Sequence, residues 1–335
     1  MNIAVHMAGR RQSGLTMVEL LVGLAVGSFL MIGAMQIFSQ SRQAFVINES
    51  IAGVHDTAQL ALDTIENDLR MASNWGRSSR AVAIDGRSVP GDPNPNNLPA
   101  PVACGEAWSL DIALPVDGTN NQYTLPCLPR SGAQANSDII TVRRATVAPV
   151  AVDDARLQVQ TTRIQGQIFS GSTPPESFSV AVNPSTGLPA STTHNLIVSS
   201  YYVAGDSELM PGVPTLRRKR LSTFNGEPSI IDEEIAPGVE NIQIQLGIDV
   251  DQDNTVDRYV NPGEGIYDPN DATSFIPGAR VVTARIWLLV RSTYRENGIV
   301  DPKNYAPGDV QLGTFTDDFR RMQVSKTILL RNART

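Results

Sequence analysis

A long apolar run near the N-terminus constrains this chain more than any other stretch. Between Leu15 and Phe38 the sequence has one charged residue, Glu19, and no proline. As an α-helix, a run of this length extends about 36 Å, enough to cross a hydrocarbon core about 30 Å thick. A carboxylate within a membrane helix costs about 2.5–3.5 kcal/mol, so such a residue usually has a specific partner. The run therefore predicts a membrane helix in which Glu19 has a function.

The residues before this run form a short basic leader that stops at a small residue. Arg10 and Arg11 are followed by Gly14. This arrangement resembles the N-terminus of type IV pilin precursors. The resemblance implies that a prepilin peptidase cuts after Gly14 and that the new amine of Leu15 is N-methylated. It also implies that Glu19 pairs with the amine of a neighbouring subunit. Leu15 replaces the usual phenylalanine, a departure that tolerant peptidases accept.

Two other interpretations of the N-terminus remain open. A secretory signal peptide has an apolar region of about 7–15 residues and a small-x-small cleavage site. The run here is longer, and the nearby candidate site Ser39-Gln40-Ser41 is weak. A plain single-pass anchor explains the length of the run, but it explains neither Glu19 nor Gly14.

Charge and cysteine content indicate an exported protein that does not bind nucleic acid. The formal charge of the 335-residue chain is −7, and it becomes −9 when Arg10 and Arg11 leave with the leader. Nothing in this balance suggests a phosphate-binding surface. The positive-inside rule places both arginines in the cytoplasm and the later residues beyond the inner membrane, in the periplasm.

The only two cysteines, Cys104 and Cys127, are the even number expected of an exported chain. Their pairing would stabilise the fold by about 3.5 kcal/mol in the chain-entropy model. Two buried free thiols are the alternative.

The periodicity predicts that the helix continues beyond the apolar run. Apolar residues recur at steps of three and four, the period of an amphipathic helix. They are Ile51, Val54, Ala58, Ala61, Ile65, Leu69 and Ala72. One helix from about Leu15 to Ala72 is therefore expected, with its second part packed on a sheet. Gly23 and Gly27 form a small-xxx-small pair that would let another helix approach closely.

Later segments resemble PilW-type minor pilins. They are Ala61–Ala72 followed by Asn74-Trp75-Gly76, then Ser137–Arg144, then Gly238-Val239-Glu240 leading into Gly247-Ile248-Asp249, and finally Leu330-Arg331-Asn332. The resemblance implies a pilin-like α+β fold, a long N-terminal α-helix packed on an antiparallel β-sheet head. It also implies other minor pilins, the major pilin and a PilY-type tip protein as partners.

The expected domains are a leader (1–14), a membrane and assembly helix (15–38), a stem helix (39–72) and a β-rich periplasmic head (73–335). Proline and asparagine predict a loop from Ser78 to Pro101. Predicted strands are Trp108–Leu114, Asp138–Val147, Leu196–Val203, Thr215–Leu221, Val239–Ile248, Arg280–Thr293 and Met322–Leu330. Alternation in Ile242–Leu246 predicts a half-buried antiparallel strand. The basic run Arg217–Arg220 is interpreted as a solvated strand edge rather than a binding patch.

The stretch from Asp249 to Asp257 is the most chemically suggestive in the chain. Its acids alternate and then recur four residues on, a spacing that places carboxylates inside a tight loop. Hard oxygen ligands suit Ca²⁺, and the candidate ligands are Asp249, Asp251, Asp253, the Thr255 carbonyl and Asp257. Asn254 and Val260 replace the glycine and glutamate of an EF-hand, so a shorter calcium loop fits better. A turn of acidic residues without an ion is the alternative.

Motifs of catalysis are absent from the sequence. It contains no G-x-S-x-G, H-E-x-x-H, P-loop or C-x-x-C pattern. We therefore expect a minor pilin that acts by assembly, not an enzyme. Two alternatives remain, a minor pseudopilin of type II secretion and an adhesin exposed at the fibre tip.

Overall fold

A computed structural model describes residues 14–99, 101–175, 185, 187, 190–296, 298–299 and 301–334 of the chain. The chain divides into two compact units, one ending at Ser50 and the other beginning at Ile51. Of the predicted leader, residues 1–13, with Arg10 and Arg11, lie outside the described residues.

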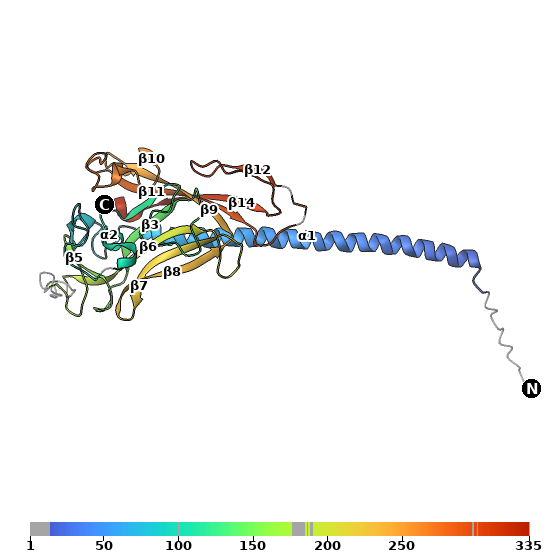
Figure 1. Cartoon of the computed structure of the whole chain (residues 1–335), viewed down its shortest axis with the longest axis horizontal. Helices are drawn as coiled ribbons and strands as arrows, with labels where there is room; N and C mark the ends of the chain where they lie inside the picture. Colours follow the sequence, from blue (N-terminus) through green and yellow to red (C-terminus); the bar gives the residue numbers. More distant parts are fainter. Residues whose placement is uncertain are drawn as a thin grey trace, which may run out of the picture. The chain divides into compact units, whose positions relative to one another are not determined.

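One helix, α1 (Met17–Met71), runs through 55 residues without interruption (Figure 1). Its bounds agree with the helix predicted from about Leu15 to Ala72. The chain leaves the helix at Ser73, whose φ of 64° lies in the left-handed region that ends many helices. The part of α1 in the second unit, from Ile51 on, belongs to the head.

The larger sheet of the head has eight strands, in the order β1-β5-β4-β6-β3-β2, with β7 and then β8 added beside β6. All its pairs are antiparallel except β1 with β5. Its strands are β1 (Ile84–Asp85), β2 (Val116–Thr119), β3 (Ile139–Ala145), β4 (Gln158–Thr161), β5 (Gly166–Phe169), β6 (Thr192–Ala204), β7 (Thr215–Phe224) and β8 (Glu227–Pro237).

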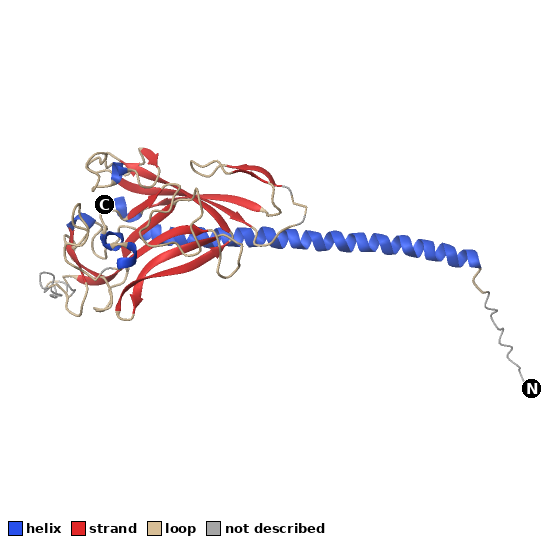
Figure 2. Cartoon of the chain, in the orientation of Figure 1, coloured by secondary structure: helices blue, strands red, loops and turns tan. Residues whose placement is uncertain are grey.

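The second sheet has four antiparallel strands in the order β10-β9-β11-β14. Its strands are β9 (Val239–Asp249), β10 (Arg258–Val260), β11 (Arg280–Arg291) and β14 (Arg321–Leu329), and a small hairpin pairs β12 (Asp301–Tyr305) with β13 (Gly313–Phe315). The short helices are α2 (Glu106–Leu110), η1 (Ala81–Ala83), η2 (Val102–Cys104), η4 (Gly265–Tyr267) and η5 (Arg331–Arg334). Figure 2 shows the head as mainly strands, so the predicted α+β class is confirmed.

The main core of the head lies between the second part of α1 and the two sheets. The predicted apolar stripe is buried there from Val54 to Ala72, whereas Ile51 remains 46% exposed. A second cluster lies around Trp75, Trp108 and the two cysteines. Burial of the stripe, rather than helix propensity, therefore holds this part of α1 on the sheets.

Three predictions about the head were wrong in detail. The expected strand Trp108–Leu114 begins inside α2 and ends in a turn. The expected loop from Ser78 to Pro101 contains η1 and β1. The segment Ile242–Leu246 is antiparallel as predicted, but Gln243 on its second face is also buried, because the chain just before β3 lies against it. Its buried Gln243 donates to the Asn136 carbonyl at 2.9 Å, which compensates the burial of a polar side chain.

The basic run Arg217–Arg220 is not a solvated edge. It lies in β7, between β6 and β8, and Arg217 and Lys219 are buried. β8 places Asp232, Glu233 and Glu234 opposite the run, so each cation has an acidic partner. The edge interpretation failed because these acids are distant in sequence and β8 was not predicted.

Candidate functional site

The first turn of α1 ties the side chain of Glu19 to Thr16. Oε2 of Glu19 accepts hydrogen bonds from the backbone N–H of Thr16 at 3.0 Å and from its hydroxyl at 2.9 Å. The Glu19 N–H donates back to the Thr16 hydroxyl at 3.3 Å. These reciprocal bonds form a capping box, in which Thr16 and Glu19 each satisfy a backbone N–H that the helix leaves free. The T-x-x-E spacing of Thr16 and Glu19 before an apolar run predicts this motif, which was not among the expectations drawn from the sequence.

The capping box uses only one oxygen of the Glu19 carboxylate. Both bonds that Glu19 accepts end on Oε2, and among the described residues Oε1 accepts none. The side chain is exposed. The carboxylate can therefore accept a cation from another molecule while the cap remains intact.

The apolar segment Leu15–Phe38, which includes the first part of α1, is exposed to solvent in the single chain. Leu15, Leu24 and Phe29 are 76%, 64% and 77% exposed. The helix is long and apolar enough to span a membrane. Gly23 and Gly27 have no atom within 4 Å of a Cβ built on them, so the helix offers another helix a close approach there.

Ion pairs fasten the last turns of α1 to the head. Nη2 and Nε of Arg144 donate to Oδ1 of Asp68 at 2.8 and 3.0 Å, and the Tyr201 hydroxyl donates to Oδ2 at 2.6 Å. Burial, together with the charge of Asp68, raises the pKa of Tyr201, so the hydroxyl remains a donor. Glu66 of the same helix pairs with Lys326 of β14 and with Arg70. The helix is thus bonded to both sheets.

A ladder of charges joins β7 to β8. Lys219 and Arg217 donate to the two oxygens of Asp232 at 2.7 and 2.8 Å, and Arg218 contacts Glu233 at 2.6 Å. Burial works against the charge of Asp232, but hydrogen bonds from Lys219, Arg217 and Tyr202 hold its pKa below the usual value. These residues stabilise the sheet and are not a free basic patch.

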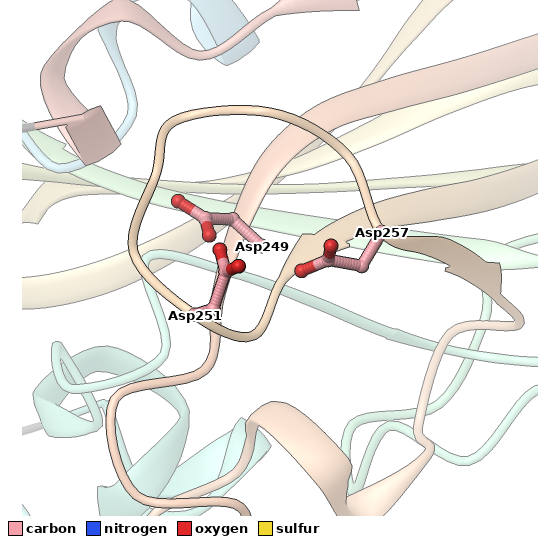
Figure 3. Close-up of side chains that lie close together, drawn as sticks. All are labelled: Asp249, Asp251 and Asp257. Carbon is pink, nitrogen blue, oxygen red and sulfur yellow. The ribbon is translucent and has the colours of Figure 1, made fainter.

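The acidic loop follows β9 and brings part of the predicted calcium set together. Ligand atoms of Asp249, Asp251 and Asp257 lie within 4.8 Å of one another, and Figure 3 shows the three carboxylates turned toward the same space inside the loop. Asp253 is not in this group, and its Oδ1 instead accepts from the N–H and hydroxyl of Thr255 at 2.7 and 2.6 Å. Asn254 has a φ of 69°, in the left-handed region that asparagine tolerates, so it can take the place of the EF-hand glycine in the turn.

Arg280 of β11 already provides positive charge at this loop. Its Nε and Nη2 donate to Oδ2 of the buried Asp249 at 3.1 and 3.0 Å. Asp249 also accepts from the N–H groups of Gln252 and Asn254 at 2.7 and 3.0 Å. Asp251 and Asp257, both exposed, are the carboxylates best placed for a cation. Calcium binding by the loop stays a prediction.

Cys104 and Cys127 form a disulfide across 23 residues of sequence. Both cysteines are buried in the second hydrophobic cluster. The bond ties η2, just before α2, to the segment that follows β2.

Comparisons with known proteins match both ends of the chain. The model of the type IV pilus-assembly protein W family matches residues 200–332, and the prokaryotic N-terminal methylation motif matches residues 9–35, which include Gly14 and Glu19. No curated protein matches the sequence. A solved type IV-like pilin from Thermus thermophilus is 11% identical, with 66% of this chain and 84% of that chain covered and a TM-score of 0.29.

The two family matches show that the chain carries both the N-terminal methylation motif, on its apolar helix, and the PilW match, in its strand-rich head. The motif implies processing by a prepilin peptidase and association with other pilins, and pilins are structural proteins rather than enzymes. The chain is a member of the type IV pilin family, of the PilW type.

Proposed function

We propose that this minor pilin helps to initiate or cap the assembly of type IV pili. The supporting observation is Glu19, which sits at the start of a bare apolar helix with one carboxylate oxygen unused. A prepilin peptidase removes the leader after Gly14, and the amine of Leu15 is methylated. The segment Leu15–Phe38 then holds the subunit in the inner membrane with its head in the periplasm.

Extraction into a fibre requires a replacement for the membrane around this segment. Sister helices provide apolar surface for residues such as Leu24 and Phe29, and Gly23 and Gly27 permit a close crossing. The N-terminal amine of a neighbouring subunit pairs with Glu19, which offsets the cost of its burial in an apolar bundle. The partners in this scheme are other minor pilins, the major pilin and a PilY-type tip protein.

Deletion of the gene, followed by complementation, separates this function from its alternatives. Loss of surface pili and of twitching, with both restored by the wild-type copy, is the expected result. Normal pili with lost secretion of exoproteins would assign the chain to type II secretion instead. Normal pili with lost attachment would make it an adhesin at the fibre tip.

Processing is tested at Gly14. Replacement of Gly14 by leucine should leave the leader attached, because the peptidase needs a small residue before the cut. Gly53, an exposed helical glycine with open space around it, provides the control substitution Gly53→Leu, which should not affect cleavage. Sequencing of the mature wild-type protein should begin at Leu15, and any other start would refute this cleavage site.

A further inference from the structure

An arginine-rich pocket of about 170 Å³ lies beside the last turn of α1. Its lining includes four arginines, from β3, the loop before β4 and β7, namely Arg144, Arg156, Arg218 and Arg220. Asp68 is the acidic residue among its lining residues. Such a concentration of positive charge is notable in a chain with a formal charge of −7.

The strand register explains why the arginines gather around Ser199. Residues directly opposite on antiparallel strands point to the same face of a sheet. Ser199 of β6 is opposite Arg220 of β7, and two residues away on either side Ile197 is opposite Arg144 and Tyr201 is opposite Arg218. Guanidinium groups from the two neighbouring strands therefore flank Ser199 on the face that Tyr201 presents to Asp68.

The carboxylates nearby do not fully compensate these cations. Arg144 pairs with Asp68, and Arg156 pairs with Asp153. Glu233 is shared between Arg218 and Arg220, so four guanidinium groups face three carboxylates. Arg220 and Arg156 donate to these acids through Nε alone, and within the described residues their terminal nitrogens have no other hydrogen bond.

The buried side chain of Ser199 also indicates that the pocket binds a ligand. Its side chain lines the pocket and is 1% exposed, and its hydroxyl has no hydrogen-bond partner among the described residues. A buried hydroxyl without a partner is rare in native proteins, since it loses its bonds to water without replacement. A ligand oxygen in the pocket would satisfy it.

We propose that this pocket binds a small oxyanion, a carboxylate or a phosphate, through the terminal nitrogens of Arg220 and Arg156 and the hydroxyl of Ser199. Planar guanidinium groups match the paired oxygens of both anions. The site lies entirely in the head, and its function does not depend on the assembly role of Glu19.

Calorimetric titration of the full chain in detergent, at constant ionic strength, tests the proposal with inorganic phosphate and with acetate. At least one anion should bind saturably. The anion with the lower Kd shows whether the pocket prefers a carboxylate or a phosphate. Arg220→Gln should weaken binding at least tenfold. Ser199→Ala should weaken it several-fold without lowering the thermal midpoint, because it removes a hydroxyl that has no protein partner.

The exposed Arg258 of β10 provides the matched control, since Arg258→Gln removes the same charge far from the pocket lining and should not change binding. If the Arg220→Gln variant does not fold, the affinity of the Ser199→Ala variant alone tests the proposal. Absence of saturable binding for both anions would overturn the proposal. So would unchanged affinity in Ser199→Ala.

Discussion

The two parts of α1 have similar local structure but opposite surroundings. In residues 17–50 most apolar side chains are exposed, and the described side-chain hydrogen bonds of Glu19 and Ser28 reach only three residues along the chain. In residues 54–71 the apolar stripe is buried, and Glu66 and Asp68 pair with cations on strands of both sheets. One continuous helix therefore serves two purposes, because its last turns are part of a folded head while the apolar side chains of its first turns are exposed.

The largest effect expected from this difference concerns a pair of leucines. Leu69→Ala removes a fully buried side chain from the main core and should lower the free energy of unfolding of the head by about 2–5 kcal/mol. Leu24→Ala, at a position 64% exposed, should change it by less than about 0.5 kcal/mol. Denaturant titration followed by tryptophan fluorescence measures this, since Trp75, Trp108 and Trp287 all lie in the head. Equal losses in the two variants would contradict the division.

A smaller effect is expected from a pair of aspartates on the same helix. Asp68→Asn weakens the charged hydrogen bonds to Arg144 and Tyr201, at a cost of about 1.5–3 kcal/mol. Asp56→Asn, at an exposed position, is the control and should be nearly neutral. The same unfolding experiment applies, and a neutral Asp68→Asn would mean that these bonds do not hold the helix to the head.

The sequence was most informative where its signal is local. The helix followed from its apolar period, and its ends were predicted within two residues. The basic run in β7 was misinterpreted because its neutralising acids come from β8, a strand without a clear pattern of its own. Trp108–Leu114 was predicted as a strand because it is apolar, yet it begins in α2, and its Trp108, Leu110 and Ile112 are buried in the cluster that holds the disulfide.

The candidate sites show the same difference between local signals, which the sequence reveals, and long-range contacts, which it does not. Gly14 and Glu19 could be identified as candidates from the spacing of the pilin motif. The capping box between Thr16 and Glu19 could also have been predicted, from the T-x-x-E spacing. Arg280 at the acidic loop could not be predicted, because it reaches Asp249 from 31 residues away across a strand pair. The arginine pocket could not be predicted either, since Arg144, Ser199 and Arg220 come together only through the register of three strands.

The last effect expected in the head concerns calcium. Millimolar Ca²⁺ should raise the melting temperature by a few degrees, as a ligand that binds only the folded state stabilises it by about 2.7 kcal/mol at a hundredfold excess over Kd. Mg²⁺ should do less because it dehydrates reluctantly. Asp251→Ala should remove the effect, whereas Asp85→Ala, at an exposed acid on β1, should not. Identical melting in Ca²⁺ and in chelator would leave the loop as a turn stabilised by Arg280.

The most direct test of the central claim is the number of surface pili in a strain whose only copy carries Glu19→Gln. Glutamine preserves the capping box but removes the charge that pairs with a neighbouring amine. Thr16→Ala does the reverse, because it removes the hydroxyl of the cap and keeps the carboxylate. We predict that Glu19→Gln abolishes pili while the cleaved protein accumulates normally, and that Thr16→Ala cells remain piliated. Wild-type piliation in Glu19→Gln would contradict the proposed role of the Glu19 charge in assembly.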